Sequence, residues 1–232
     1  MNKYSIIIPV YNEKDLIPDL LNNLDIYIKS NNEIIIIDDG STDGSNKILK
    51  ENKEITFIRV SQNKGKGSAI RKGLKVAREN KIIIFDGDLE IHTNEIKKLM
   101  ILDKENDIVS AMGYRFNSPP LNSIYNVGNS IFTYFYNFLF KTHHKDILCC
   151  AKSFYKYLIE DINLKSKKFD IDVELSHFLS NRKLYPKPKE IYIQYKRRNI
   201  KEGKKLKVSD GFIILSIILK LKRNYNSETK EL

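Results

Sequence analysis

Short runs of apolar, mostly β-branched residues alternate with segments of helical periodicity in the first half of the chain. The candidate strands are residues 5–8, 34–37, 56–60, 82–85 and 107–112. The candidate helices are residues 17–28, a short one through 48–49 that is capped by 41–43, 69–77, and 96–100 capped by 93–95. Continuous apolar runs of this length are typical of buried parallel strands. The alternation predicts an α/β fold with a mostly parallel central sheet flanked by helices.

The second half is less regular. Residues 124–140 are rich in Tyr and Phe on nearly all helical faces. This pattern indicates either a core helix, which we favour, or a helix that is buried on one side and meets another apolar surface on the other. Further elements are expected at 169–180 (helix), 190–195 (half-exposed strand) and 208–223 (helix), with a basic loop at 196–207.

Three polar clusters directly follow candidate strands, at residues 9–13, 38–41 and 86–90. In parallel sheets, ligands bind at the carboxyl ends of the strands, so these clusters are expected to meet at one edge. The cluster FDGDLE places Asp86, Asp88 and Glu90 around a tight turn, and the repulsion between them is relieved by a hard divalent cation such as Mg²⁺ or Mn²⁺. Such a cation usually also binds phosphate oxygens, so a phosphorylated ligand is expected. The alternative is a solvated acidic turn.

Other polar segments have a functional and a structural interpretation each. A carboxylate of the pair Asp38-Asp39 can bind a nucleobase or a ribose hydroxyl, or the pair can simply begin a turn. Residues 63–67, NKGKG, can present amides and lysines to phosphate, although the spacing matches neither a P-loop nor the dinucleotide fingerprint. The basic loop, with Arg198, Lys204 and Lys205, can close over a diphosphate or can be a solvated charge run.

Composition narrows the class of protein. Among 232 residues, Lys and Arg number 40 against 29 Asp and Glu, a net charge of +11 that favours anionic partners. No nucleic-acid-binding motif occurs, so no nucleic acid partner is expected. The two cysteines are adjacent, which argues against a disulfide framework and favours a reducing, cytoplasmic location. No apolar run is long enough to span a bilayer, so a soluble chain or one peripheral at the cytoplasmic membrane face is expected. No repeat or linker divides residues 1–232, which predicts one domain.

Several motifs in order and spacing resemble a known family. SIIIPVYNE, IIIIDDGSTDGS, NKGKGSAIRKGL and FDGDLE are similar to the nucleotide-diphospho-sugar transferases of glycosyltransferase family 2. DILCCAKSFYK, FDIDVEL and IQYKRRNIKEGKKLKVSDGF resemble, within that family, the polyprenyl-phosphate (dolichyl-type) sugar transferases. The resemblance covers roughly residues 4–222.

This resemblance implies a GT-A fold and an inverting, metal-dependent transfer of a sugar from a nucleotide diphosphate to a polyprenyl phosphate. Residues up to about 112 would bind the nucleotide-sugar and residues from about 113 the acceptor. The implied nucleotide-sugar-binding residues are Pro9, Tyr11, Glu13, Asp39, Asp86, Gly87 and Lys205. The implied metal ligands are Asp86, Asp88 and Glu90. The candidate catalytic residues are Asp88, Arg115, Arg198, Asp172 and Glu174.

The acceptor stays open at this level. A lipid phosphate is already an anion, whereas a saccharide or other hydroxyl acceptor needs a base, for which Asp172 and Glu174 are candidates unless they form a polar helix face. The lipid-phosphate enzymes usually carry a second arginine near the aromatic helix, but no Lys or Arg occurs here between Arg115 and Lys141. A non-catalytic nucleotide- or nucleic-acid-binding module is the alternative from another class. With a lipid acceptor, the aromatic helix, the basic surface and the helix at 212–221 are expected to contact the membrane.

Overall fold

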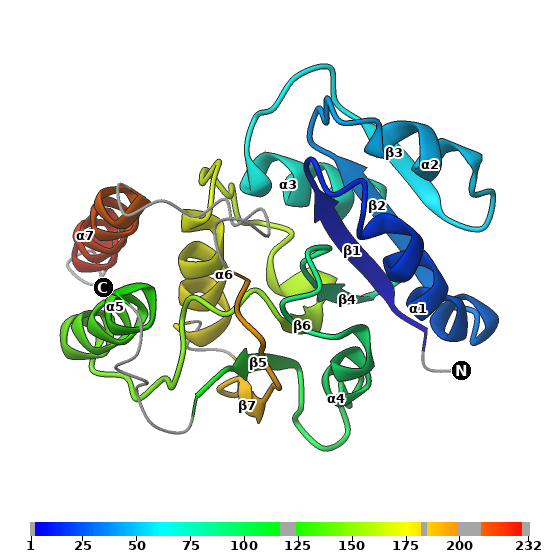
Figure 1. The fold of residues 1–232 in the computed structure, drawn as a ribbon. Helices are drawn as coiled ribbons and strands as arrows, with labels where there is room; N and C mark the ends of the chain where they lie inside the picture. The colour runs from blue at the N-terminus through cyan, green and yellow to red at the C-terminus, as the bar shows by residue number, and fades with distance from the viewer. Residues whose placement is uncertain (1–2, 117–123, 182–184, 199–209, 229–232) are drawn as a thin grey trace.

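Seven strands form one mixed sheet in the order β3-β2-β1-β4-β6-β5-β7 (Figure 1). The computed structural model describes residues 3–116, 124–181, 185–198 and 210–228. The strands are β1 Ser5–Val10, β2 Glu33–Asp38, β3 Thr56–Arg59, β4 Lys81–Ile84, β5 Ser110–Tyr114, β6 Lys152–Tyr155 and β7 Lys189–Tyr192. All strands except β6 point the same way, which confirms the predicted mostly parallel sheet.

The parallel part of the sheet forms because its strands are apolar on both faces. In β1, Ile6 pairs with Ile34 of β2 on one side and with Ile83 of β4 on the other. These isoleucines are buried, and helices cover both faces of the sheet, as a continuous apolar strand requires. The strands predicted at 5–8, 34–37, 56–60 and 82–85 are therefore confirmed.

β6 is the one strand of the described sheet that the hydrophobic pattern did not predict. It is four residues long and carries Lys152, which is completely buried and whose ammonium donates to the backbone carbonyl of Cys149. A strand with a buried lysine lacks the apolar signature on which the prediction depended. The strand predicted at 107–112 is shifted, because a tight turn with Asp107 at φ 56° precedes β5. Only the first part of the strand predicted at 190–195 is β7.

Helices flank the parallel strands near the predicted positions. They are α1 Ile17–Lys29, α2 Ser45–Glu51, α3 Lys66–Val76 and α4 Ile96–Leu99. The predicted start of α2 at 41–43 is early, since Gly44 adopts φ 97° and Asp43 accepts a hydrogen bond from the Ser45 amide before the helix begins. Residues Thr93–Glu95 form a 3-10 turn in front of α4.

A second apolar cluster lies between α5 (Ile124–Phe140), α6 (Asp170–Ser180) and α7 (Asp210–Glu228), at the end of the molecule opposite α2 and β3 (Figure 1). The buried members from α5 are Tyr136 and Phe140, and those from α7 are Ile214, Ile217, Ile218 and Leu221. The opposite side of α5 exposes Tyr134 and Phe138. The aromatic helix is thus buried on one side only, rather than being a core helix throughout.

Candidate active site

The carboxyl ends of β1, β2 and β4 open onto a cavity of about 600 Å³. Residues that follow β5 and β7, together with α6 and α7, line its other side. The members of the predicted site that line it are Pro9, Tyr11, Glu13, Asp39, Asp86, Gly87, Asp88, Glu90, Arg115, Asp172 and Arg198. Glu174 does not line it, and Lys205 lies outside the described residues. The individual roles assigned to these residues stay predictions.

Asp39 anchors the NKGKG segment to the end of β2. Its carboxylate accepts hydrogen bonds from the backbone amides of Lys64, at 3.0 Å, and Gly65, at 2.7 Å. Burial of the carboxyl raises its pKa, an effect that these two hydrogen bonds oppose. Gly65 and Gly67 are needed for a close approach of chains, since a Cβ at either would lie 2.4 Å from a backbone oxygen of residues 166–167. The segment therefore positions the lysine that begins α3, and the amide of Gly65 is already engaged.

That lysine, Lys66, joins the two halves of the cavity. Its ammonium lies 2.9 Å from the carboxylate of Asp86 and 2.8 Å from that of Asp172 on α6. The ammonium is buried and also lies 5.8 Å from the ring centre of Phe169. Although burial opposes the charged form, the two carboxylates hold the pKa of Lys66 well above its ordinary value. Asp172, a candidate base by sequence, is in this structure half of an ion pair.

The Asp-x-Asp turn is shaped by Gly87. A Cβ at this position would lie 2.6 Å from the side chain of Val10 in β1, so only glycine allows the turn to pack this closely on the sheet. The next residue, Asp88, faces a concentration of negative charge. Burial raises the pKa of its carboxyl to about 6, and the neighbouring carboxylates of Asp86 and Glu90 add to the shift.

These carboxylates fit a divalent cation. The raised pKa of Asp88 means that its ionised carboxylate is poorly compensated by positive charge in this structure. A hard divalent cation that is bound by the carboxylate oxygens would provide that charge. Within residues 3–116, 124–181, 185–198 and 210–228, no three His, Cys, Asp or Glu side chains already converge as a ligand set. Such a site, with Asp86 and Asp88 as its protein ligands, keeps positions for phosphate oxygens and water, as Mg²⁺ sites usually do.

Glu90 has a further structural task. Its carboxylate accepts hydrogen bonds from the hydroxyl of Tyr195, at 2.7 Å, and from the backbone amide of Arg198, at 2.9 Å. Its backbone carbonyl accepts from the amide of Lys196. Burial raises the pKa of Tyr195, so its hydroxyl stays a donor. Glu90 therefore fixes the segment that follows β7. Each of its carboxylate oxygens accepts one of these hydrogen bonds and has a second lone pair, so its role as a metal ligand stays a prediction.

Arg198 lies between Glu13 and the acidic turn. Its guanidinium donates two hydrogen bonds to the carboxylate of Glu13, at 2.8 and 3.0 Å, and lies 3.5 Å from Asp88. Glu13 follows β1, whereas Arg198 follows β7, so only the folded sheet brings them together. A guanidinium in this position can stabilise negative charge that develops near Asp88.

Arg115, predicted to face phosphates, is paired with a residue that the sequence did not single out. Its Nε and Nη2 donate to the carboxylate of Asp146 at 2.7 and 3.0 Å. The guanidinium also lies 5.2 Å from the ring centre of Tyr195. The ion pair holds the pKa of Arg115 well above its ordinary value, against the effect of burial. Arg115 lines the cavity, but its charge is already balanced.

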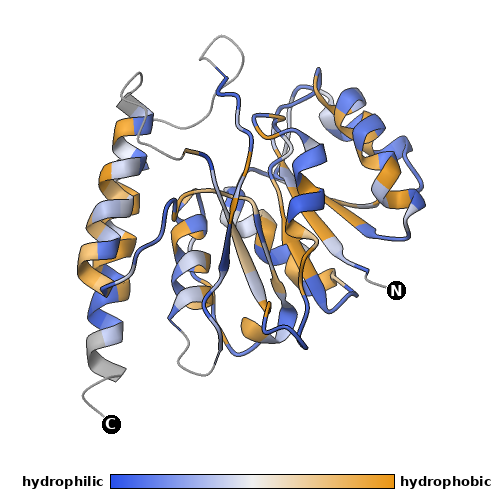
Figure 2. Cartoon of the chain, turned by 90° about the horizontal axis from the view of Figure 1, so that it is seen from below, coloured by the Kyte–Doolittle hydropathy of each residue, from blue (hydrophilic) through white to orange (hydrophobic). Residues whose placement is uncertain are grey.

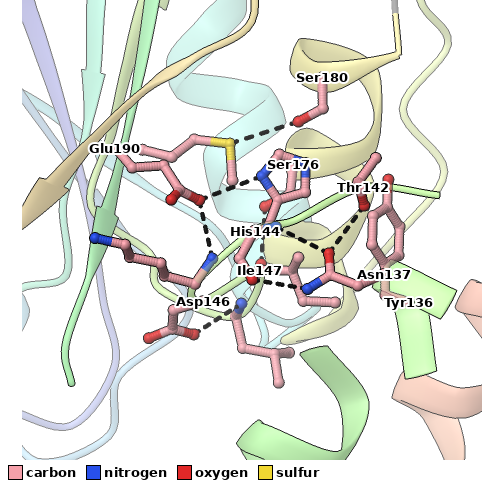
Figure 3. Close-up of polar contacts among 12 residues, drawn as sticks. Tyr136, Asn137, Thr142, His144, Asp146, Ile147, Ser176, Ser180 and Glu190 are labelled. Carbon is pink, nitrogen blue, oxygen red and sulfur yellow. Dashed lines mark hydrogen bonds and ion pairs between the residues drawn. The ribbon is translucent and has the colours of Figure 1, made fainter. Parts of the chain in front are cut away.

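A set of hydrogen bonds fixes the loop that carries Asp146 (Figure 3). The side-chain amide of Asn137 donates to the carbonyl of His144, and its oxygen accepts from the His144 amide. From the neighbouring strand, Glu190 accepts from the amide of Lys145 at 2.9 Å. These contacts join α5 and β7 and place the carboxylate of Asp146 beside Arg115.

Glu174, the other candidate base, caps a loop. Its carboxylate accepts three hydrogen bonds from the backbone amides of Lys165 and Ser166, at 2.9 to 3.1 Å. It is buried and lies apart from the cavity described above. Its geometry fits loop anchoring, and it is not positioned to take a proton from a ligand there.

Four residues of the cavity region were missed or undervalued by sequence reasoning. They are Lys66, Asp146, Tyr195 and Arg197. Lys66 and Arg197 lie in segments whose positive charge was noted, although their partners were not foreseeable. Asp146 begins the motif DILCCAKSFYK, but nothing in that motif indicated that its carboxylate pairs with Arg115.

A mixed, mostly parallel sheet with an Asp-x-Asp turn at its ligand-binding edge defines the GT-A class of glycosyltransferase folds. The profile of "Glycosyl transferase family 2" matches residues 5–162. The chain belongs to that family, which confirms the resemblance drawn from its motifs.

Curated relatives match part of the chain. The chain is 36% identical over 116 residues to an undecaprenyl-phosphate 4-deoxy-4-formamido-L-arabinose transferase of Proteus mirabilis (strain HI4320). The matched region covers 45% of this chain and 35% of that protein. The protein of the same name from Klebsiella pneumoniae is 35% identical over 121 residues, covering 48% and 37%. The match thus spans about a third of the length of these relatives.

Solved structures share the fold. Glucosyl-3-phosphoglycerate synthase from Mycobacterium tuberculosis, in complex with Mn²⁺, UDP and phosphoglyceric acid, superposes with a TM-score of 0.76 at 14% identity, covering 95% of this chain and 78% of that one. A mannosyltransferase from Pyrobaculum calidifontis in complex with GDP-Man and Mn²⁺ gives 0.56 at 15% identity, covering 84% and 57%. At these identities the likeness concerns the fold.

Proposed function

We propose that this chain transfers a sugar from a nucleotide-diphosphate sugar to the phosphate of a polyprenyl phosphate, with a divalent cation at Asp86 and Asp88. The observation that carries this proposal is the cavity at the strand ends, which the acidic turn shares with Arg115, Arg197 and Arg198. The named relatives act on undecaprenyl phosphate, which supports the same acceptor class for this chain.

The donor side is supported by the chemistry of its lining. Pro9, Tyr11 and Asp39 lie at the ends of β1 and β2, where a nucleoside fits beside the sheet. The Asp-x-Asp turn lies next to them, and a bound Mg²⁺ or Mn²⁺ there would neutralise a leaving diphosphate. Solved structures of the same fold contain Mn²⁺ with UDP or GDP-Man, although these titles do not decide which metal or base this chain takes.

The acceptor side is supported by the partners of the two candidate bases, Asp172 and Glu174. Glu174 is bound to backbone amides, and Asp172 is paired with Lys66. A hydroxyl nucleophile would need one of them to accept a proton. A phosphate monoester has its second pKa near ~6 and is largely dianionic at neutral pH, so it attacks without a base.

In the transfer, an oxygen of the acceptor phosphate bonds to the anomeric carbon while the bond from that carbon to the diphosphate breaks. Attack opposite to the leaving group inverts the configuration at this carbon. Arg198 lies 3.5 Å from Asp88 and is positioned to stabilise charge on the departing diphosphate. Lys66, the first residue of α3, pairs with both Asp86 and Asp172 of α6, so the acidic turn keeps its orientation.

A lipid acceptor requires contact with a membrane, and α5 and α7 offer a surface for it. The residues that α5 exposes are Ile131 (58%), Tyr134 (75%) and Phe138 (72%), and α7 exposes Phe212 (78%), Leu215 (37%) and Leu219 (50%). Both sets are spaced i, i+3, i+7, so each forms one stripe. In Figure 2, hydrophobic and hydrophilic residues alternate along α7.

Charge along these helices supports the same contact. α5 carries no charged residue, and α7 carries Lys220, Lys222 and Arg223 but no acid between Asp210 and Glu228. An apolar stripe beside basic residues is typical of helices that lie on anionic membranes. None of the described helices is long and apolar enough to cross a bilayer.

The proposal is tested by a donor screen. UDP-sugars and GDP-mannose are incubated with the protein and Mn²⁺ or Mg²⁺, with and without undecaprenyl phosphate, and the organic extract is analysed for a sugar-phosphate lipid. Asp88→Ala is expected to abolish transfer, whereas Asp161→Ala, which removes an exposed acid, is expected to leave it unchanged. Transfer only to hydroxyl acceptors would overturn the acceptor assignment, and full activity of Asp88→Ala in EDTA would overturn the metal role.

Membrane contact is tested separately with vesicles. Co-sedimentation with phosphatidylglycerol vesicles is compared for the wild type and for Phe138→Glu. Loss of one exposed aromatic side chain from a bilayer corresponds to about 2 kcal/mol, so a fall in partitioning of roughly 10-fold or more is expected. Ile26→Glu, which alters an exposed apolar residue on α1, is the matched control. Equal partitioning of both variants and the wild type would contradict the contact.

A further inference from the structure

We propose that Arg197 binds the phosphate of the acceptor, an inference that rests on the proposed function and names the residue on which its acceptor side depends. Arg197 lines the cavity, but it takes part neither in the ion pair of Arg115 with Asp146 nor in that of Arg198 with Glu13. Its place in the cavity therefore needs another explanation. Its guanidinium contacts the first turns of α5.

The backbone around Arg197 is fixed from the nucleotide side. The carboxylate of Glu90 accepts from the Tyr195 hydroxyl and from the amide of Arg198, and its carbonyl accepts from the amide of Lys196. These three bonds hold the residues on either side of Arg197. The position of its side chain is therefore set by the same acid cluster that faces the donor.

The guanidinium is oriented from the acceptor side. It lies 5.4 Å from the ring centre of Tyr125 and 5.7 Å from that of Tyr195. Its Nη2 donates to the side-chain oxygen of Asn126, which like Tyr125 belongs to the first turns of α5. Two aromatic rings and an amide thus restrain a side chain that is flexible when it is free.

The remaining donors of Arg197 are buried and have no partner. Nε and Nη1 make no hydrogen bond, and no carboxylate among the described residues forms an ion pair with this guanidinium. Arg115 is balanced by Asp146 and Arg198 by Glu13. A desolvated cation without a counter-charge is unfavourable, and an anion that enters the cavity removes that cost.

The location favours the acceptor as the source of that anion. The donor diphosphate is expected at Asp86 and Asp88, whereas Arg197 contacts α5, and Ile214 of α7 lines the same cavity. Of the two helices that expose apolar stripes, α5 contacts this guanidinium and α7 lines the same cavity. A ligand with a phosphate and a long apolar tail satisfies both features, with the phosphate at Arg197 and the tail along α5 and α7.

The sequence of α5 is consistent with this use of Arg197. No Lys or Arg occurs between Arg115 and Lys141, so α5 has no cation of its own at its cavity end. Arg197 reaches α5 from the segment after β7 and supplies the charge from a distant part of the chain.

The test compares Arg197→Gln, Arg197→Lys and the control Lys196→Gln, which removes an exposed positive charge at the neighbouring position. Michaelis constants for undecaprenyl phosphate and for the donor are measured, together with binding of farnesyl phosphate, farnesol and Mn²⁺-UDP by calorimetry. Arg197→Gln is expected to raise KM for undecaprenyl phosphate roughly 10- to 100-fold and to weaken farnesyl phosphate similarly, as for loss of charge-assisted hydrogen bonds to phosphate. Its donor KM and Mn²⁺-UDP affinity, which also report on folding, are expected to stay within about 2-fold of the wild type.

The variants separate the possible results. If Arg197 recognises the phosphate, Arg197→Lys should bind farnesyl phosphate more tightly than Arg197→Gln does. Both variants should then bind farnesol as the wild type does. The assignment is overturned if both variants keep the wild-type KM for undecaprenyl phosphate. It is also overturned if the substitutions weaken the affinity for Mn²⁺-UDP instead. In either case the proposed function stands. Absence of any transfer to undecaprenyl phosphate by the wild type overturns the proposed function and this inference with it.

Discussion

Lys66 holds two acids together, and its removal is expected to be strongly destabilising. Its ammonium lies 2.9 Å from Asp86 and 2.8 Å from Asp172, and the side chains of Lys66 and Asp172 are only 10% and 5% exposed. Lys66→Met keeps most of the volume but leaves two carboxylates facing each other without a cation. Breaking a buried ion pair by removing one partner costs about 3–5 kcal/mol, so a loss of this size in the free energy of unfolding is expected at neutral pH.

Urea unfolding followed by circular dichroism measures this loss. Lys75→Met changes an exposed lysine on the same helix and is expected to alter stability by less than about 0.5 kcal/mol. Adding Asp172→Asn to Lys66→Met is expected to recover part of the loss, since one of the two uncompensated charges is then gone. Added Mn²⁺ is expected to stabilise Lys66→Met more than the wild type. A loss below about 1 kcal/mol for Lys66→Met would refute the view that the ion pairs hold α3, α6 and the acidic turn together.

Two further predictions concern packing around the site. Burial lowers the pKa of His177 from 6.5 to about 4, and the unprotonated Nδ1 lies 3.0 Å from the hydroxyl of Tyr136. Because the unfolded chain binds this proton more readily, stability is expected to fall by up to about 3 kcal/mol as pH drops from 6.5 towards 4. Urea unfolding of His177→Gln should show a smaller fall, and an identical pH profile would contradict this cause. Gly67→Ala would place a Cβ 2.4 Å from the carbonyl oxygen of Ser166 and should cost roughly 1–3 kcal/mol in thermal unfolding. Gly128→Ala, which meets nothing within 4 Å in α5, should be neutral or stabilising by about 0.5–1 kcal/mol, and equal effects of the two would contradict the steric explanation.

Local sequence determined the parallel part of the fold and the donor side of the site. Isoleucine-rich runs form strands wherever both faces are buried, so β1, β2 and β4 follow from hydrophobicity alone. Parallel strands end at the same edge, so the carboxylates that follow them meet without further information. The acidic turn at Asp86 and Asp88 was accordingly found from its position after a strand.

Partners of opposite charge far apart in the chain were decided only by the tertiary structure. Whether Asp172 is a base or an ion-pair partner depends on Lys66, which lies 106 positions away and reaches it only when α3 packs beside α6. The hydrophobic pattern did not predict β6, because this strand contains a lysine. Lys152 can be buried because its ammonium donates to a backbone carbonyl, a contact that only the tertiary structure shows.

The acceptor side follows the same rule. Arg115 and Arg197 are equally basic in the sequence, but Arg115 is paired with Asp146, whereas Arg197 forms no ion pair with a carboxylate in the part of the chain that the structure describes. Residue type sets the charge that a side chain can carry. The packing of β5, β7, α5 and α7 decides which charges are cancelled within the protein and which remain for a ligand, because electrostatic interactions depend on distance and burial and are insensitive to order along the chain.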